Sequence, residues 1–164
     1  MNKPLVAIVM GSANDWDVMQ QAAQQLKDFG IAYDARAISA HRSPDLLAEY
    51  IKDMVAQGVQ CFIAGAGGAA HLAGVVASKT TLPVLGVPIP SKYLKGMDSL
   101  LSTVQMPKGI PVATFAIGEA GAANAGLFAV STLALNDEKL AERLKQYRKK
   151  QADAIASTIL PPLS

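Results

Sequence analysis

The sequence predicts a three-layer α/β fold with a doubly wound, parallel, five-stranded sheet and an extra C-terminal helix. Three observations lead to this prediction. Short apolar runs alternate five times with longer segments whose apolar residues recur at helical spacing. The first run, 5–10, lacks the polar alternation of a half-exposed strand, as expected for a strand covered on both faces. Right-handed crossovers between such strands are typical of flavodoxin-like or Rossmann-like folds.

The predicted strands are short, mostly apolar runs, and each is followed by Gly, Ser or Pro, which are residues typical of loops. They comprise residues 5–10, 31–38, 59–64, 84–87 and 111–117. The shortest of them is bounded by Pro83 and Pro88. We therefore expect a loop at the carboxyl end of every strand.

The predicted helices follow those loops and comprise about 15–29, 44–58, 69–79, 94–105, 120–135 and 138–158. Asn14 or Asp15 is expected to cap the first helix, and Gly30 to end it. Pro44 suits the first position of the second helix, since proline lacks the N–H that is unpaired there anyway. The last helix is expected to form a C-terminal arm over about 137–158.

The composition favours one folded domain whose helices approach each other closely. Of the 164 residues, 51% are hydrophobic, 17% are charged and 5% are aromatic, while alanine and glycine are abundant. This balance argues against disorder and is compatible with burial in a homo-oligomer. No linker or repeat divides the chain, so we expect a single catalytic domain, 1–164.

The charge pattern gives little support for nucleic-acid binding. The net charge is +2, and much of the basic character lies in the last helix, where acidic residues interrupt it. We interpret that helix as a solvated or oligomer-spanning arm, with a nucleic-acid arm as the weaker alternative. No run approaches the roughly 18 apolar residues of a membrane helix. We therefore expect a cytoplasmic protein with neither nucleic acid nor membrane as partner.

The single cysteine, Cys61, lies in the apolar run 59–64. One cysteine excludes a disulfide within the chain and favours a reducing compartment. A thiol in this position is typical of a small buried hydrophobic residue, and a nucleophile is the less favoured interpretation.

Three polar or glycine-rich segments follow the first three predicted strands, at 11–16, 39–44 and 65–71. In an open parallel sheet, ligands bind beyond the carboxyl ends of the strands. These segments are therefore expected to form one site. The first segment suits phosphate binding or ordinary turn and cap chemistry equally well. It is not a Walker loop, and the third lacks the spacing of a dinucleotide fingerprint, so nicotinamide cofactors are not expected.

The segment 39–44 points most clearly to catalysis. Arg42 offers a planar fork that matches phosphate, and Ser39 and Ser43 add hydroxyl groups. Between them, His41 belongs to the residue type that exchanges protons near neutral pH. A histidine that only caps the backbone is the alternative. His71 either functions in the site or caps a helix, and two histidines 30 residues apart without further ligands make a poor metal site.

Together these segments resemble the signatures of the N5-carboxyaminoimidazole ribonucleotide mutases, the bacterial-type phosphoribosylaminoimidazole carboxylase catalytic subunits of purine biosynthesis. The similarity rests on 10–16 (MGSANDW), 39–44 (SAHRSP) and 64–72 (AGAGGAAHL). It continues, in order and over nearly the whole chain, through 84–88, 98–102, 104–107, 109–113 and 121–125.

The resemblance implies an isomerase without cofactor or metal, acting on a small ribonucleotide. It would move a carboxylate from the exocyclic nitrogen of an aminoimidazole to the adjacent ring carbon, by decarboxylation and recarboxylation. His41 matches the catalytic histidine that carries the proton. The resemblance further implies a homo-octamer. The substrate-binding positions that it implies are Ser12, Asn14, Asp15, Ser39, Arg42, Ala66, Gly67, Ala69, His71 and Leu72.

Three residues depart from the family pattern. Asn14 stands where serine is usual, so an amide replaces one hydroxyl donor to phosphate; Ser43 replaces threonine, and Glu119 replaces lysine. Two other functions remain open. One is a carboxylase that uses free carbon dioxide and the unsubstituted aminoimidazole ribonucleotide. The other is a non-catalytic flavodoxin-like carrier, although the binding segments offer Trp16 as almost their only aromatic residue.

Overall fold

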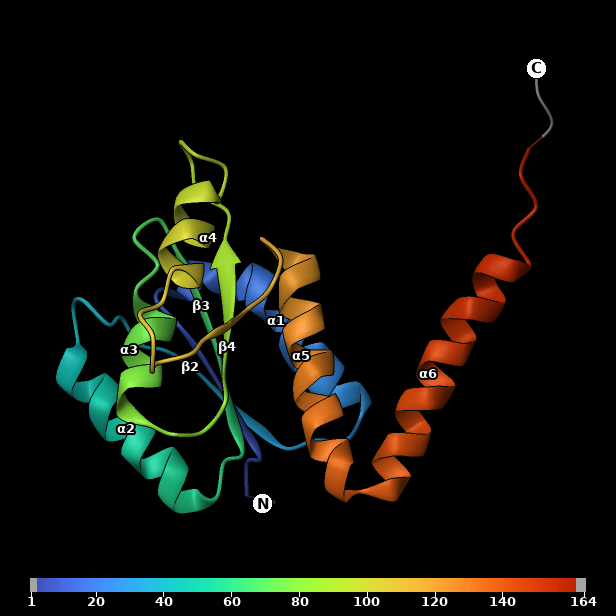
Figure 1. Ribbon diagram of the computed structural model, residues 1–164, viewed down its shortest axis with the longest axis horizontal. Coiled ribbons are helices and arrows are strands. Elements are labelled where there is room, and N and C mark those ends of the chain that lie inside the picture. Colours follow the sequence, from blue (N-terminus) through green and yellow to red (C-terminus); the bar gives the residue numbers. More distant parts are fainter. Residues whose placement is uncertain (1–2, 162–164) are drawn as a thin grey trace.

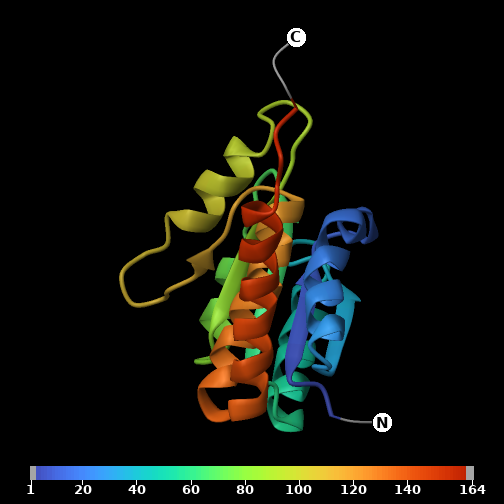
Figure 2. The same ribbon diagram turned by 90° about the vertical axis from the view of Figure 1, so that its right-hand side faces the viewer.

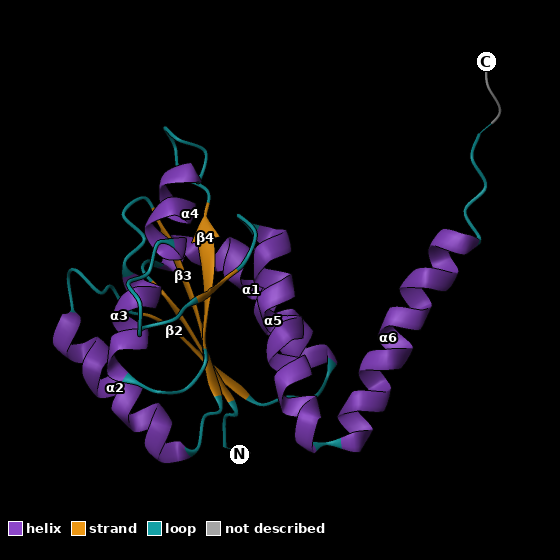
Figure 3. Cartoon of the chain, viewed as in Figure 1, coloured by secondary structure: helices purple, strands orange, loops and turns teal. Residues whose placement is uncertain are grey.

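The computed structural model describes residues 3–161 and confirms the predicted fold class. Its five strands are all parallel and lie in the order β2-β1-β3-β4-β5. Helices cover both faces of the sheet (Figure 3). The strands are β1 (Val6–Met10), β2 (Tyr33–Ala37), β3 (Cys61–Gly67), β4 (Val84–Ile89) and β5 (Ala113–Thr114). Residues 1–2 and 162–164, which the predicted domain 1–164 includes, lie outside the described residues.

The helices form a layer on each face of the sheet, apart from the last one, which extends away from these layers (Figure 1). They are α1 (Trp16–Asp28), α2 (Pro44–Gln57), α3 (Leu72–Lys79), α4 (Met97–Val104), α5 (Glu119–Leu133) and α6 (Glu138–Ala156), with short 3₁₀ helices η1 (Ala13–Asp15) and η2 (Ala134–Asn136). Alternate residues of β1 point to opposite faces, as the pleat requires. Val6 and Ile8 pack with α1 and α5, whereas Ala7 and Val9 pack with α2 and α3.

Small residues allow α1 and α5 to approach closely. A side chain at Gly126 of α5 would place its Cβ 2.8 Å from the carbonyl oxygen of Ala22 in α1. Ala122, Ala125 and Ala129 of α5 are fully buried on the same face. The alanine and glycine content noted above is therefore used, at least in part, within the protomer.

The edge of the sheet differs most from the prediction. The fifth strand, predicted over 111–117, has ladder pairing only at Ala113 and Thr114, while β4 continues through Pro88 to Ile89. The nitrogen of Pro88 faces β5, because the carbonyl group of the same residue accepts from Gly118 on that side. Since β5 has already ended there, the missing N–H of Pro88 costs no ladder hydrogen bond.

Two predicted boundaries near the site were also wrong. β3 was expected to end at Ala64 and extends to Gly67, and α3 was expected to begin at Ala69 and begins at Leu72. The sheet extends because Ala66 and Gly67 pair with the unexpected end of β4. The two stops at Gly30 and Gly58 were predicted correctly, and both glycines have positive φ angles.

The first half of the arm formed by α6 packs against the rest of the protomer. Leu140 is buried, and the guanidinium of Arg143 donates to the carbonyl oxygens of Asp28 and Phe29 at 2.8 and 2.9 Å. Tyr147 packs edge-on against Phe29. The axis of α6 diverges from that of α5 (Figure 1), and the chain then rises past the end of α5 (Figure 2).

Among the described residues, no helix is both long enough and apolar enough to cross a membrane.

Candidate functional site

The loops that follow β1, β2 and β3 meet at the carboxyl edge of the sheet and enclose one cavity. Its volume is about 350 Å³, within the range of about 300 to 1,000 Å³ for small-molecule sites. The cavity is lined by Gly11, Ser12, Asp15, Ser39, Ala40, His41, Arg42, Ala66, Gly67, Ala69, His71 and Leu72.

Every predicted site residue except Asn14 lines this cavity. The side chain of Asn14 is exposed in η1, and its backbone N–H donates to the hydroxyl of Ser12 at 3.2 Å. Gly11 and Ala40 line the cavity but were not among the predicted residues. Their positions within the segments 11–16 and 39–44 were the sequence signal that could have identified them.

The first loop is held by a capping box. Ser12 accepts from the Asn14 N–H, and the Ser12 N–H donates to the Asp15 carboxylate at 3.0 Å. Ser12 is the N-cap of η1, which precedes α1. Asp15, one of the two expected caps, stands at the N-cap position of α1 but makes no side-chain capping hydrogen bond to that helix. Burial raises the pKa of Asp15, and hydrogen bonds from the backbone N–H groups of Ser12 and Gly11 act in the opposite direction.

The second loop fixes Arg42 across the cavity mouth. The backbone N–H of Arg42 donates to the hydroxyl of Ser39 at 3.2 Å, and its guanidinium donates to the carbonyl oxygen of Gly11 at 3.1 Å. The Ser43 hydroxyl donates to the carbonyl oxygen of Ser39 at 3.0 Å. The guanidinium has further N–H groups, so Arg42 presents a fixed positive charge with spare donors at the site.

His41 and His71 form a direct pair. Nε2 of His41 lies 2.8 Å from Nδ1 of His71, and the two rings are nearly perpendicular, with an interplanar angle of 87°. One of the two facing nitrogens must carry the proton of this hydrogen bond and the other must accept it. His71 therefore contacts the predicted catalytic residue and does more than line the wall. It also stands at the N-cap position of α3 without a side-chain capping bond.

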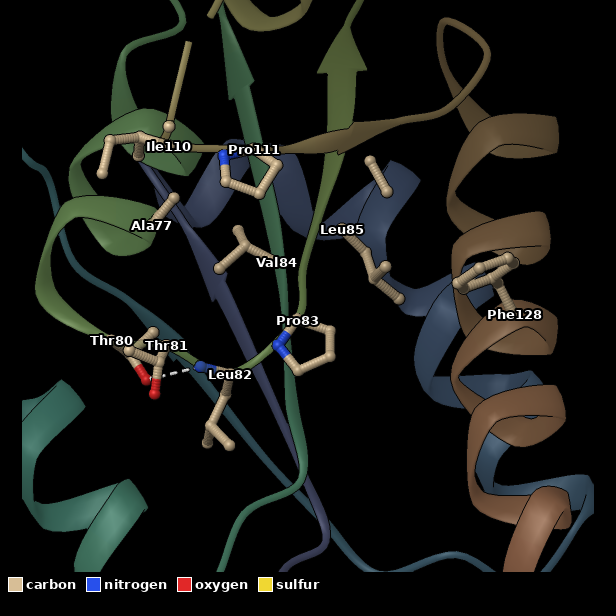
Figure 4. Close-up of a pocket in the computed structure, with 12 residues that line it drawn as sticks. Ala77, Thr80, Thr81, Leu82, Pro83, Val84, Leu85, Ile110, Pro111 and Phe128 are labelled. Carbon is tan, nitrogen blue, oxygen red and sulfur yellow. Dashed lines mark hydrogen bonds between the residues drawn. The ribbon is translucent and has the colours of Figure 1, made fainter. Parts of the chain in front are cut away.

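A second and larger cavity, of about 520 Å³, lies elsewhere and has different chemistry. It is formed along β4 and β5 by apolar and threonine side chains, including Pro83, Leu85, Ile110 and Phe128 (Figure 4). Among the residues that the structure describes, no titratable side chain lines it. It therefore lacks the groups that an acid–base reaction needs, despite its size.

Trp16 and Cys61 lie outside the cavity at the carboxyl edge. Trp16 lines a small cleft with Tyr33 and Lys27, so it is a pocket wall away from the predicted site. Cys61 is buried in β3 as predicted, and burial raises the pKa of its thiol to about 12. A thiol in that state is a poor nucleophile. Within residues 3–161, no three His, Cys, Asp or Glu side chains gather closely enough to hold a metal ion.

Comparisons with known proteins agree on one family. A profile described as AIR carboxylase matches residues 5–154. A Brucella melitensis protein named N5-carboxyaminoimidazole ribonucleotide mutase is 58% identical over 151 residues, covering 92% of this chain and 93% of that protein. A protein of the same name from Saccharolobus solfataricus is 54% identical over 157 residues, covering 96% and 98%. The crystal structure of Treponema denticola PurE superposes with a TM-score of 0.85 at 32% identity, covering 93% and 94%.

Proposed function

The chain belongs to the AIR carboxylase family, and on that premise we propose that it is an N5-carboxyaminoimidazole ribonucleotide mutase, an isomerase of purine biosynthesis. The observation that carries this proposal is the cavity at the carboxyl edge. It brings a histidine pair, an arginine and a carboxylate to the walls of a space suited to one small ribonucleotide. The relatives of this chain that bear the mutase name match it over almost their whole length.

The proposed reaction needs one group that gives a proton and later takes one back. Cleavage of the bond between the exocyclic nitrogen and the carboxylate releases carbon dioxide, and the nitrogen receives a proton. The adjacent ring carbon then attacks the carbon dioxide, and a proton leaves that carbon. The same group is regenerated, so no redox partner or external acid is consumed.

His41 is the residue that we assign to this proton transfer. It lies on a loop at the cavity, and its Nε2 is held by His71 at 2.8 Å. That contact fixes the orientation of the ring and leaves Nδ1 as the nitrogen that does not face His71. A positioned imidazole is the residue type best suited to give and take a proton near neutral pH.

The other polar residues have proposed roles in binding. Arg42 and Ser39 bind the phosphate group, since a guanidinium fork and a hydroxyl match its oxygens. Asp15 accepts from the ribose hydroxyls, and Ser12 lies near the migrating carboxylate. Ala66, Gly67, Ala69 and Leu72 form an apolar wall for the flat ring and the released carbon dioxide. Asn14, which does not line the cavity, is proposed only as an outer contact to phosphate.

The family description itself favours testing a carboxylase as the second candidate. The experiment supplies purified protein with either the carboxyamino substrate or the unsubstituted aminoimidazole ribonucleotide, at low bicarbonate and without ATP. The mutase proposal predicts rapid turnover of the first substrate and little turnover of the second. Turnover of the second alone, rising with added bicarbonate, would identify the carboxylase.

We also propose that the protein is a cytoplasmic homo-oligomer, with an octamer as the expected size. Large apolar side chains on the arm and just after it support association, since Ile155 and Ile159 are 76% and 93% exposed. Light scattering on the purified chain should give a mass near eight times the monomer mass of 17.1 kDa. A monomer at micromolar concentration would contradict the proposal.

A further inference from the structure

The loop between β3 and α3, residues 68–71, contains only glycine and alanine before His71. Such a loop has few side-chain atoms with which to pack, so main-chain hydrogen bonds must fix its position. Gly68 adopts a φ of +69°, a conformation that glycine permits at low cost. Within the loop, the hydrogen bonds reach only from Ala70 to Gly68 and from His71 to Ala69, at 2.9 Å each. These short-range bonds shape the loop but do not attach it to the rest of the fold.

Hydroxyl groups of α4 attach the loop instead. The Ser99 hydroxyl accepts from the backbone N–H of Gly68 at 2.9 Å and donates to the carbonyl oxygen of Ile89, the last residue of β4, at 2.6 Å. The Ser102 hydroxyl accepts from the backbone N–H of Ala70 at 3.0 Å. Two N–H donors of the loop, at Gly68 and Ala70, are thus paired with a helix that lies beside the end of β4 (Figure 1).

The burial of the Ser99 hydroxyl indicates that its attachment to the loop is specific. Within residues 3–161, Ser99 and Thr103 are the only Ser, Thr, Asn, Gln, His or charged residues that are buried, with exposed fractions of 0% and 3%. A buried hydroxyl without a partner is costly, so a core position is occupied by serine only where both of its hydrogen bonds are made. Ser99 makes both, one to the loop and one to β4.

We infer that Ser99 and Ser102 are positioning residues that hold His71 in place against His41. The hydrogen bonds from α4 fix the loop that carries His71, and the imidazole of His71 lies 2.8 Å from that of His41. Ala70, whose backbone N–H donates to the Ser102 hydroxyl, directly precedes His71 and is buried, with 1% of its surface exposed. The effect that we expect on turnover rests on the proposed function, because the inference concerns the same site.

The first test compares two hydroxyl deletions on the same helix. Ser102→Ala removes the only contact of the Ala70 N–H outside the loop and leaves it the short-range bond to Gly68. Thr103→Val removes a buried hydroxyl that donates at 2.7 Å to its own helix, at Ser99, and only marginally, at 3.5 Å, to the carbonyl oxygen of Ala70. A displacement of reacting groups by about 1 Å can cost up to about 10²-fold in rate. We therefore expect Ser102→Ala to lower kcat by about tenfold or more with a smaller change in KM, and Thr103→Val to leave kcat close to the parent value. Equal losses in both variants, in step with their melting temperatures, would overturn the inference.

A double-mutant cycle tests whether Ser102 acts through His71. In a His71→Asn background, Ser102→Ala is expected to lower kcat no further. Independent, multiplying losses would overturn the inference. If Ser102→Ala does not fold, Ser102→Cys replaces it, because a thiol of similar size keeps weak donor and acceptor capacity. Partial recovery of kcat by the Cys variant is expected, and no difference between Ala and Cys would count against the role of the hydrogen bond.

A spectroscopic readout separates this inference from the proposed function. The chain has two histidines, so an isotope label confined to histidine reports only His41 and His71. Ser102→Ala is expected to shift the imidazole nitrogen resonances of both residues, and Thr103→Val to leave them in place. Unchanged resonances in Ser102→Ala would overturn the positioning role, whether or not the protein has mutase activity. Shifted resonances in a protein without mutase activity would preserve the positioning role and reject the proposed function.

Discussion

Replacing His41 by asparagine separates catalysis from folding. The ring of His41 is exposed on a loop, so its removal leaves no large cavity in the core. The main loss to stability is the hydrogen bond to His71, and such bonds contribute about 0.5 to 1.5 kcal/mol net. Because this pair is exposed, we expect the lower end of that range. Asparagine retains hydrogen-bonding groups and a moderate size, so the loop should keep its course.

The expected kinetic loss is much larger. A positioned general acid–base contributes about 10²- to 10⁴-fold to rate. This range corresponds to about 3 to 5 kcal/mol of activation free energy, since each factor of ten is about 1.4 kcal/mol. The loss can exceed this range, because one residue both gives and takes the proton. His41→Asn should therefore lose nearly all turnover while its free energy of unfolding falls by less than about 1 kcal/mol.

The assay combines steady-state kinetics, substrate titration and thermal melting for His41→Asn and His71→Asn. His71→Asn serves as the matched control, because it breaks the same contact from the other side. It should retain measurable turnover, reduced below that of the parent by the loss of support for His41. Normal turnover in His41→Asn, or a loss of activity that follows unfolding, would refute the assignment of the proton transfer to His41.

Four further perturbations test other parts of the account. Arg42→Ala should weaken substrate binding by about 1.5 to 3 kcal/mol through loss of a charge-assisted contact, and Arg42→Lys should recover part of the lost binding free energy. Titration calorimetry measures both, and parent-like affinity in both variants would reject phosphate binding by Arg42. Burial raises the pKa of Asp15, so above that pKa its ionised form costs folding free energy. Asp15→Asn, which keeps an acceptor for the Ser12 N–H, should therefore melt higher than the parent at pH 7 and bind substrate more weakly. That gain in melting temperature should vanish as the pH falls through the folded-state pKa of Asp15, and a lower melting temperature at pH 7 would contradict the reasoning. Tyr50→Phe removes a hydroxyl that donates to the Asp34 carboxylate at 2.8 Å, so urea unfolding should show a loss of about 1 to 2 kcal/mol with turnover unchanged, and an unaltered midpoint would count against it. Protein treated with a chelator should keep full activity, and activity that is lost and then restored by zinc or magnesium would show that a metal is needed.

The layered fold and the cavity at the carboxyl edge were predictable from the sequence, because both depend on local pattern and on a general rule of parallel sheets. The alternation of apolar runs with helical segments fixed the order of strands and helices, and ligand binding at the carboxyl edge follows from that order. The rule placed 11–16, 39–44 and 65–71 at one edge, and the structure brings His41, Arg42 and Asp15 to one cavity there.

Features that depend on long-range contacts were not predictable. The contact between His41 and His71 joins residues 30 apart and depends on how the β3–α3 loop is held, which Ser99 and Ser102 determine from another helix. The end of β5 was missed because the length of the strand depends on its pairing with β4, which the apolar run that suggested a longer strand does not reveal. The cap at Ser12 was missed because a 3₁₀ turn before α1 has no periodicity of its own.

The central claim is that the cavity transfers a carboxylate within one bound ribonucleotide, and the fate of a labelled carboxylate tests it most directly. Substrate carrying ¹³C in the carboxylate on the exocyclic nitrogen is converted by the purified protein in excess unlabelled bicarbonate, and the ¹³C content at the ring carbon of the product is measured. The account predicts that the label is retained, because carbon dioxide released inside the cavity is recaptured before it escapes. Product whose carboxylate has the isotopic content of the bicarbonate pool would contradict the account.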